Sequence, residues 1–363
     1  MQIAFRTDAS LQIGTGHVIR CLSLADGLRA QGAQCLFICR THQGHMCEII
    51  RQRGYRVKSL LTIKHQNQQN SPVHSDWLGT NWQTDAEETA SAIACTKFDW
   101  LVVDHYAIDY QWEEALADNY HQLFVIDDLA DRLHSCNLLL DQNLGRKPQD
   151  YLDLVPRHCK VLCGPLYARL RPNFSELRPY SLQRRQAQPN LQNLLITMGG
   201  VDYSNATGKI LQALKFCSLP QESRITVVMG LAAPWIENVR KLAAKMPWQT
   251  EVLVNVKDMA KIMADSDLAI GAAGSTSWER CCLGLPTLMV VLAENQKLVA
   301  EALNASQAAR LIPALRNFDA ELILAIHELS KPENQTRMSF AASVITDGHG
   351  VDKIVEVMGM FCA

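Results

Sequence analysis

The sequence predicts an α/β protein in which two doubly wound, Rossmann-like domains face each other across a cleft. Short apolar runs alternate with longer helical patterns, which is typical of a parallel sheet covered by helices on both faces. The alternation stops near the middle of the chain and then starts again. A length of 363 residues also exceeds the size at which single hydrophobic cores stop growing. These observations together predict two halves of comparable size.

The composition is that of a globular protein, with 48% apolar and 20% charged residues. A formal net charge of −2 argues against nucleic acid or an anionic membrane as the main partner, because both require a cationic surface. No window approaches the ~18 unbroken apolar residues of a membrane span, and the N-terminus lacks the pattern of a signal peptide. The twelve cysteines have no zinc-like spacing, so we expect reduced thiols, no metal and a cytoplasmic location.

In the first half, apolar runs predict strands at 2–6, 35–39, 100–106 and 122–128, and helical patterns predict helices at 17–30 and 46–52. The polar stretch 61–88 breaks the pattern. We expect it to be a surface loop, and Trp77 and Trp82 leave open the alternative that it overhangs a site.

A second break, which is rich in proline, predicts a linker at 171–190 between a first domain (1–170) and a second domain (191–345). After it, apolar runs predict further strands near 193–200, 224–230, 251–256, 267–274 and 286–292. A final helical pattern lies within 346–363, and the sequence leaves open whether this helix crosses back to the first domain.

The loop after the first strand contains Gly14 and Gly16 and is followed directly by His17. Glycines allow tight backbone conformations, and the first amides of a helix carry partial positive charge that suits a diphosphate. The positive end of a helix also favours the neutral imidazole, which a general base requires. A simple turn followed by a packed histidine explains the same residues equally well, and the spacing excludes a dinucleotide fingerprint.

Polar residues follow two later strands of the first half. Asp104, His105 and Tyr106 end one of them, and Asp127 and Asp128 end the next. Ligands of doubly wound sheets bind beyond the carboxyl ends of the strands, so these side chains are candidates for a site. For the two adjacent aspartates we favour a structural or orienting role, because no ligand-like pattern accompanies them.

The second half repeats this arrangement. Gly199 and Gly200 close a strand, and we expect Asp202 or Ser204 to cap the next helix and leave a second helix N-terminus ready for an anion. The run 271–286 offers small residues up to Gly274, then hydroxyls and amides at Ser275 and Thr276. Further residues of this half are candidates for ribose and sugar hydroxyls; they are Glu279, Asn295 and Gln296. For Glu279, a capping-box contact to the start of its own helix is the structural alternative.

Taken in this order, the motifs resemble the GT-B sugar-nucleotide superfamily, which includes the peptidoglycan transferase MurG. The closer resemblance is to the PseG-type UDP-2,4-diacetamido-2,4,6-trideoxy-β-L-altropyranose hydrolases of pseudaminic acid biosynthesis, a route to flagellin glycosylation. It rests on the stretches 5–25, 102–109, 137–144, 163–174 and 197–202 and on the segment around Glu279. The stretch 61–88 and the residues beyond about 330 contain no motif that we can match.

The resemblance implies that water cleaves the sugar–UDP bond by attack at the anomeric carbon, with inversion and without metal or cofactor. It assigns His17 as general base, Tyr106 to the reacting centre and Glu279 to the ribose, and it places Asn205 and Arg171 near the ligand. The expected partner is a UDP-activated diacetamido sugar, and we expect a monomer without stable membrane association. A GT-B glycosyltransferase with a sugar acceptor, a UDP-sugar 2-epimerase and a non-catalytic nucleotide-sugar binding subunit remain alternatives.

Overall fold

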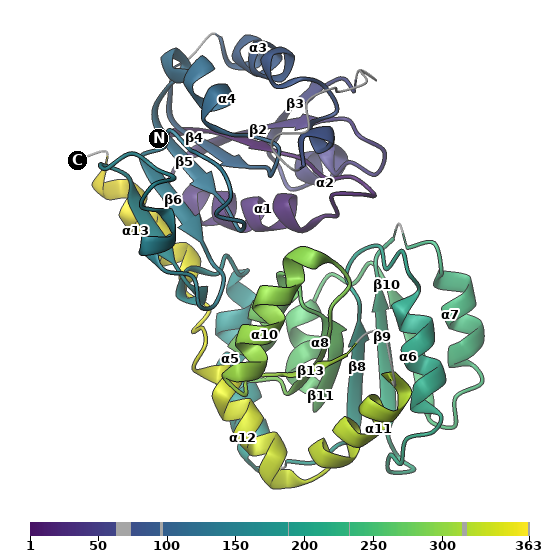
Figure 1. The fold of residues 1–363 in the computed structure, drawn as a ribbon. Helices are drawn as coiled ribbons and strands as arrows, with labels where there is room; N and C mark the ends of the chain where they lie inside the picture. The colour runs from purple at the N-terminus through teal and green to yellow at the C-terminus, as the bar shows by residue number, and fades with distance from the viewer. Residues whose placement is uncertain (63–73, 95–96, 188, 232, 314–317, 362–363) are drawn as a thin grey trace. The chain divides into compact units, whose positions relative to one another are not determined.

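The computed structural model describes residues 1–62, 74–94, 97–187, 189–231, 233–313 and 318–361, with every side chain among them except that of Asn295. The chain divides into two compact units. The first contains Met1–Arg169 together with Gly350–Ala363, and the second contains Leu170–His349. Each unit is a parallel sheet with helices on both faces, which confirms the predicted α/β class (Figure 1).

The sheet of the first unit has seven parallel strands in the order β3-β2-β1-β4-β5-β6-β7. These are β1 (Gln2–Thr7), β2 (Gln34–Arg40), β3 (Arg56–Leu60), β4 (Phe98–Asp104), β5 (Tyr120–Ile126), β6 (Leu138–Asp141) and β7 (Lys160–Cys163). Its α-helices are α1 (Gly16–Ala30), α2 (Cys47–Gln52), α3 (Trp82–Ile93), α4 (Tyr110–Ala115) and α13 (Gly350–Met360). Short 3-10 helices are η1 (Ser75–Leu78), η2 (Ala117–Asn119), η3 (Pro148–Tyr151) and η4 (Pro165–Tyr167).

The sheet of the second unit has six parallel strands in the order β10-β9-β8-β11-β12-β13. These are β8 (Asn193–Thr197), β9 (Arg224–Met229), β10 (Gln249–Val254), β11 (Leu268–Ala272), β12 (Thr287–Val290) and β13 (Arg310–Ile312). Its helices are α5 (Pro172–Ala187), α6 (Ala206–Leu214), α7 (Ile236–Ala243), α8 (Met259–Asp265), α9 (Thr276–Cys282), η5 (Glu294–Gln296), α10 (Lys297–Ala305), α11 (Phe318–Leu329) and α12 (Pro332–Ser343).

In each sheet, the direction in which successive strands are added to the sheet reverses at one point. In the first unit β1 pairs with β4, and Thr7 lies opposite Asp104. In the second unit β8 pairs with β11. Loops that leave two such strands in opposite directions open a crevice at their carboxyl ends, which is where doubly wound sheets bind ligands.

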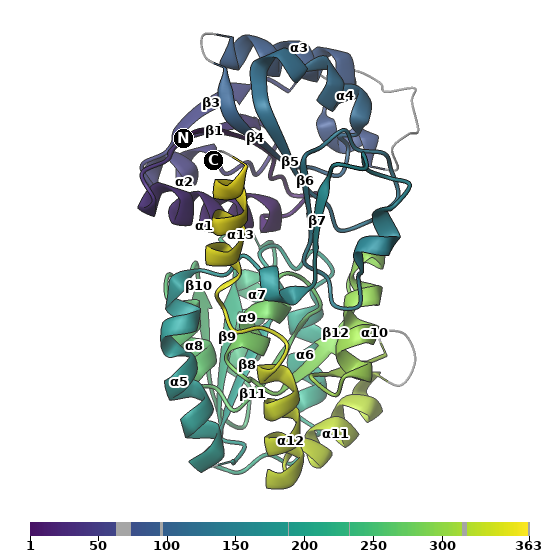
Figure 2. The ribbon, with the colours of Figure 1, turned by 90° about the vertical axis from the view of Figure 1, so that its left-hand side faces the viewer.

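The C-terminal helix α13 packs on α1, within the first unit (Figure 2). Two glycines allow α13 to pack closely, Gly27 against α1 and Gly350 against the segment after η4. A Cβ atom at Gly27 of α1 would lie 2.4 Å from Val351 Cγ1, and one at Gly350 would lie 2.3 Å from the Ala168 carbonyl oxygen. Ile354 and Met358 of α13 are fully buried in the core on this face of the sheet.

The stretch 171–190, for which the sequence predicts a linker, is mostly the helix α5, and α5 belongs to the second unit. Its buried face contains polar residues, so no apolar period reveals it. Ser181 and Arg185 are buried and donate to backbone carbonyls, Arg185 to those of Met263, Ser266 and Leu283. These carbonyls lie at the ends of α8 and α9, where a helix leaves its last acceptors without intrahelical partners.

The predicted surface loop at 61–88 is wrong in its last part, and residues 63–73 lie outside the described part of the chain. Residues from Trp82 onward form α3, which Asn81 caps by accepting a hydrogen bond from the Thr84 N–H. Asp85 of this helix is fully buried and forms ion pairs with Arg6 and Arg40. Because a charged residue, Asp85, faces the core at this position of α3, the sequence of the helix resembles that of an exposed segment.

No helix among the described residues is both long enough and apolar enough to span a membrane.

Candidate functional site

The loop between β1 and α1 is a tight turn that delivers His17 to the carboxyl edge of the first sheet. Gly14 has a φ of +80°, a conformation that favours glycine, and its N–H donates to the Ser10 carbonyl over 2.9 Å. Gly16 is the first residue of α1, and Thr15 before it makes no side-chain capping bond. His17 is buried in the first turn of the helix.

His17 is paired with Asp104 at the end of β4. The imidazole Nδ1 lies 2.6 Å from Asp104 Oδ1. Burial alone would raise the pKa of Asp104, but the charges of Arg20 and His17 outweigh burial and hold this pKa well below its usual value. An ionised carboxylate only accepts hydrogen bonds, so Nδ1 carries the proton and the Nε2 lone pair is left for another partner.

Arg20 lies one turn further along α1 and connects two carboxylates. Its Nε donates to Asp104 Oδ2 and its Nη1 to Asp128 Oδ2, both over 2.5 Å. Its Nη2 lies 3.0 Å from His17 Nδ1. Nη2 also donates to Asp104 Oδ1, the oxygen that faces the imidazole, so the fork of the guanidinium binds both carboxylate oxygens and sets the orientation of that carboxylate.

Tyr106 lies against His17, with the two rings edge to face and their centroids 4.6 Å apart. Its hydroxyl donates to Asp128 Oδ2 over 2.8 Å. Burial, and then the negative charge of Asp128, raise the pKa of Tyr106 well above its usual value. Tyr106 is therefore a neutral phenol whose proton is already engaged, which suits packing and orientation better than proton transfer.

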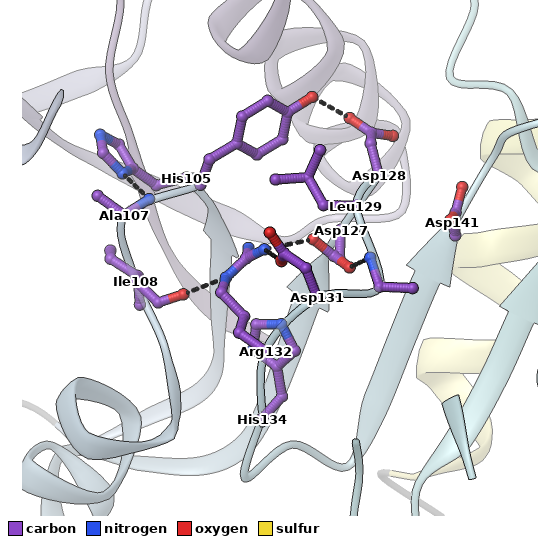
Figure 3. A network of polar contacts seen from close by, with 12 residues as sticks. His105, Ala107, Ile108, Asp127, Asp128, Leu129, Asp131, Arg132, His134 and Asp141 are labelled. Carbon is purple, nitrogen blue, oxygen red and sulfur yellow. Dashed lines mark hydrogen bonds and ion pairs between the residues drawn. The ribbon is translucent and has the colours of Figure 1, made fainter. Parts of the chain in front are cut away.

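The two aspartates after β5 have different partners (Figure 3). Asp127 accepts hydrogen bonds from Arg132, from the Ala130 N–H and from Tyr151, which agrees with the structural role expected for it. Asp128 instead holds Arg20 and Tyr106, so it orients residues that surround His17. No group of three or more His, Cys, Asp and Glu side chains within the described ranges could hold a metal ion.

Arg169, which the sequence analysis did not single out, is buried beside this cluster. Its Nη1 lies 3.9 Å from Asp104 Oδ2, and its three guanidinium nitrogens have no hydrogen-bond partner in the part of the chain that is described. Burial and then the positive charge of Arg20 lower its pKa to about 10, so it stays charged at neutral pH. Its only sequence signal is its place in the stretch 163–174.

In the second unit, the helix N-terminus after Gly199 and Gly200 is not free for an anion, which corrects that expectation. The carboxylate of Asp202 accepts hydrogen bonds from the N–H groups of Ala206 and Thr207. Asn205 is the N-cap of α6 and accepts from the Gly208 N–H. The first amides of α6 are thus occupied by the chain's own oxygens, and a carboxylate already stands where a phosphate would lie.

The turn after β11 provides a different arrangement. Gly274 has open space where a Cβ would lie, and Ser275 precedes α9 without a side-chain capping bond. Arg280 is buried beneath this turn and donates to the Ala272 carbonyl and to Ser277 Oγ. A Cβ at Gly271 would lie 2.4 Å from Arg280 Nη1, so the guanidinium would have to shift if this residue carried a side chain.

Glu279 and Arg171 are brought together, with Arg171 Nη2 3.8 Å from Glu279 Oε1. Burial raises the pKa of Glu279, while Arg171 and then Arg280 act against this rise. The capping-box alternative is not observed, since α9 has no side-chain cap at Ser275. The Glu279 carboxylate keeps acceptor capacity beside two cations, and Thr276 lies one turn before it on α9.

At the helix start after β12, one of the predicted site residues forms a hydrogen bond within the chain itself. Gln296 Oε1 accepts a hydrogen bond from the Leu292 N–H over 2.9 Å, which leaves its amide N–H₂ as the group available to a ligand. The side chain of Asn295 lies outside the description. The predicted site residues therefore form two groups, one around His17 in the first unit and one around Glu279 in the second.

Comparisons with known proteins give consistent results. Residues 190–355 match the model of the glycosyltransferase family 28 C-terminal domain. A UDP-2,4-diacetamido-2,4,6-trideoxy-beta-L-altropyranose hydrolase of Campylobacter jejuni is 26% identical over 300 residues, which cover 83% of this chain and 95% of that protein. The spore coat polysaccharide biosynthesis protein SpsG of Bacillus subtilis is 24% identical over 376 residues, with 99% of this chain and 98% of that protein covered.

Among solved structures, MurG of Acinetobacter baumannii superposes with a TM-score of 0.70 at 16% identity, over 99% of both chains. This likeness confirms the predicted GT-B fold. The resemblance inferred from the motifs is confirmed by the hydrolase from C. jejuni.

Proposed function

Because the chain has the GT-B fold and is similar over most of its length to a UDP-sugar hydrolase, we propose that it hydrolyses a UDP-linked 2,4-diacetamido-2,4,6-trideoxy sugar. The products are the free sugar and UDP. The observation that carries the proposal is the His17–Asp104 pair, in which Nδ1 is engaged and Nε2 is left to accept a proton. The altro configuration and the place in pseudaminic acid biosynthesis rest on the similarity alone.

In the proposed reaction, His17 Nε2 takes a proton from water while the water oxygen bonds to the anomeric carbon. The bond from that carbon to the diphosphate oxygen breaks, and its electron pair leaves with UDP. Attack from the face opposite the leaving group inverts the anomeric centre. UDP is a stable anion, so a paired acid carboxylate of the kind used by ordinary glycosidases is not needed, and no step calls for a metal.

The neighbours of His17 support this role. Asp104 fixes the tautomer and stabilises the imidazolium that forms when the proton arrives, as the aspartate of a catalytic triad does. Arg20 holds Asp104 in place, and Asp128 holds Arg20 and Tyr106. A base positioned in this way typically contributes about 10²–10⁴-fold to a rate.

We propose that the second unit binds UDP, as its match to the family 28 domain suggests. Glu279 would accept hydrogen bonds from the ribose hydroxyls, and the small residues up to Gly274, with Ser275 and Thr276, would approach the diphosphate. The charge of Arg280 beneath this turn favours an anion there. Arg171 orients Glu279 through their ion pair.

The same family match favours one other function, that of a GT-B glycosyltransferase. There His17 would deprotonate an acceptor hydroxyl rather than water. Both reactions ask for the same base, so the arrangement around His17 does not separate them.

The deciding experiment incubates the chain with a panel of UDP-2,4-diacetamido sugars in metal-free buffer and follows free UDP. Hydrolysis predicts that UDP is released without any acceptor, and that His17→Ala stops the release while UDP still binds. Release that requires an added acceptor would assign the chain to the transferases. Binding without release from any sugar would identify a non-catalytic subunit.

A cytoplasmic location belongs to the same proposal. The ten cysteines within the described ranges are all free thiols, as expected in a reducing compartment.

A further inference from the structure

Two rings from the segment before α3 extend the contacts of Tyr106 away from His17. Trp77 stacks on Tyr106, with ring centroids 5.7 Å apart and an interplanar angle of 24°. His74 lies 5.5 Å from Tyr106 and 4.4 Å from Trp77, again between centroids. With the contact between His17 and Tyr106, these rings form one continuous aromatic surface that begins at the base.

The backbone around η1 holds Trp77 in this position. Leu78 is 2% exposed and anchors the turn in the core. Gly79 follows with a φ of +72°, and a Cβ there would lie 2.6 Å from His42 Cε1. The positive φ favours glycine here, and the turn lies closely against His42 and the side chain of Arg40 at the end of β2.

Trp77 and His74 are both half-buried, and each has a ring nitrogen that can form a hydrogen bond. No hydrogen bond to the indole N–H of Trp77 is found among the described residues, although such a group normally finds a partner when it is covered. Burial lowers the pKa of His74, so its ring is neutral at neutral pH. The rings beside the base are therefore uncharged, and the indole donor has no acceptor among the described residues.

We propose that Trp77, together with His74, binds an N-acetyl group of the sugar next to the reacting carbon. The methyl group would pack on the ring faces, and the acetamido carbonyl would accept a hydrogen bond from Trp77 Nε1. The inference rests on the proposed function and deepens it, because it assigns recognition of the acetamido substituent to residues that no motif covers.

Trp82 provides a matched control. It is the first residue of α3, it is also half-buried, and it packs against the core on that side of the sheet. It has no ring contact with Tyr106 among the aromatic pairs of the described residues. The two tryptophans of the same segment therefore differ in whether they reach the site.

The test measures binding in a His17→Ala background, where substrate is not consumed. Isothermal titration gives the Kd of a UDP-2,4-diacetamido sugar, of UDP-glucose and of UDP for chains that also carry Trp77→Ala, Trp77→Phe or Trp82→Phe. Trp77→Ala should raise the Kd of the diacetamido sugar about tenfold and change the Kd values of UDP and UDP-glucose by less than about twofold. Trp77→Phe keeps a ring but loses the N–H, so the Kd of the diacetamido sugar should lie between those of the native and Trp77→Ala chains. Trp82→Phe should leave all three Kd values unchanged.

Equal weakening of all three ligands, or unchanged binding of the diacetamido sugar, would overturn the inference. If Trp77→Ala lowers kcat in the chain with native His17 while the Kd of the sugar is unchanged, Trp77 only supports Tyr106 and the inference is also wrong. These outcomes are separate from failure of the proposed function. A chain that binds the diacetamido sugar through Trp77 but releases no UDP would keep the inference and remove the hydrolysis.

Discussion

His17 Nδ1 lies 2.6 Å from Asp104 Oδ1, although the two residues are 87 positions apart in the chain. The contact joins the first turn of α1 to the end of β4, and the pairing of β1 with β4 makes it possible. It fixes which imidazole nitrogen carries the proton. The remaining nitrogen can then act as a base.

Asp104→Asn tests this tautomer assignment. An amide can donate to Nδ1 and so favours the wrong tautomer, and it no longer stabilises an imidazolium. We expect kcat for UDP release to fall about 10²–10⁴-fold, with the Kd of UDP unchanged. Asp99→Asn, at the other end of the same strand, is the control and should keep its rate. A near-native rate for Asp104→Asn would rule out the pair as the source of the base.

Removal of Arg20 should destabilise the fold as well as the reaction. Its side chain is 8% exposed and neutralises the carboxylates of Asp104 and Asp128. Arg20→Ala leaves these charges buried without their partner, so we expect the free energy of unfolding to fall by about 3–5 kcal/mol in urea titrations. Arg20→Lys keeps the charge, so its free energy of unfolding should fall less. Arg29→Lys on the same helix, where the arginine side chain is 48% exposed, should stay within about 1 kcal/mol of the native chain.

The pH dependence of stability should carry a signature of Asp141. Burial, and then the charge of Asp128, raise the pKa of Asp141 to about 7. Its unfolded pKa is ~3.9, so between these two pKa values the folded chain holds a proton that the unfolded chain has lost. Its contribution to stability is therefore greatest at low pH and falls as pH rises from about 4 to about 7.

Asp141→Asn lacks this titration. Chemical denaturation at a series of pH values should therefore show that the native chain loses stability relative to Asp141→Asn as pH rises through this window. Asp153→Asn, at an exposed position, should follow the native chain. If the native chain instead gains stability relative to Asp141→Asn over the window, the sign of the shift is wrong.

Glu279→Gln tests the ribose contact proposed for the second unit. A carboxylate accepts from both ribose hydroxyls more strongly than an amide oxygen does, so we expect the Kd of UDP to rise about tenfold. The rise should be smaller for 2′-deoxy-UDP, which lacks one of the hydroxyls. Glu301→Gln on the exposed surface of α10 is the control. An equal rise for both nucleotides would place Glu279 away from the ribose.

The docking of α13 should depend on the absence of a side chain at Gly27. Since a Cβ there would lie 2.4 Å from Val351 Cγ1, Gly27→Ala should lower the free energy of unfolding by about 1–3 kcal/mol. Val351→Ala removes the obstructing methyl groups, so the double variant should recover part of the loss in a double-mutant cycle. Strictly additive effects would show that the two residues do not meet.

The alternation of apolar runs and helical patterns predicts the fold class because parallel strands buried on both faces are continuously apolar. It works where buried residues are apolar, as in β1, β4 and β5. It fails for α3 and α5, whose inward-facing residues include Asp85 and Arg185. Asp85 is paired with buried arginines and Arg185 donates to carbonyls at helix ends. These partners come from distant parts of the chain, so a local sequence pattern does not reveal them.

Short strands are missed for a different reason. β6, β7 and β13 have only three or four residues, too few for a period to be recognised, whereas the equally short β12 lies within the longer apolar run 286–292. The edge strand β3 is largely exposed and reads as polar.

The candidate site, like the fold, is predictable from the sequence only in part. Residues at strand ends and at the glycine turn are visible as candidates, because parallel strands gather their carboxyl ends on one edge. Which of them pair is not visible, since the contacts of Asp104 with His17 and Arg20 span more than 80 residues. The expected capping of α6 by Asp202 is confirmed, but the sequence does not show that this cap occupies the amides expected to bind an anion. Arg169 and Arg280 lie within motif segments but have no pattern that indicates a buried cation.

Isotope labelling tests the central claim most directly. The UDP-2,4-diacetamido sugar is incubated with the chain in H₂¹⁸O, the products are weighed by mass spectrometry, and the first-formed anomer is identified by NMR. Attack by a water activated at His17 on the anomeric carbon predicts ¹⁸O in the free sugar, none in UDP, and the inverted anomer. Label in the diphosphate of UDP, or a retained anomer, would contradict the account.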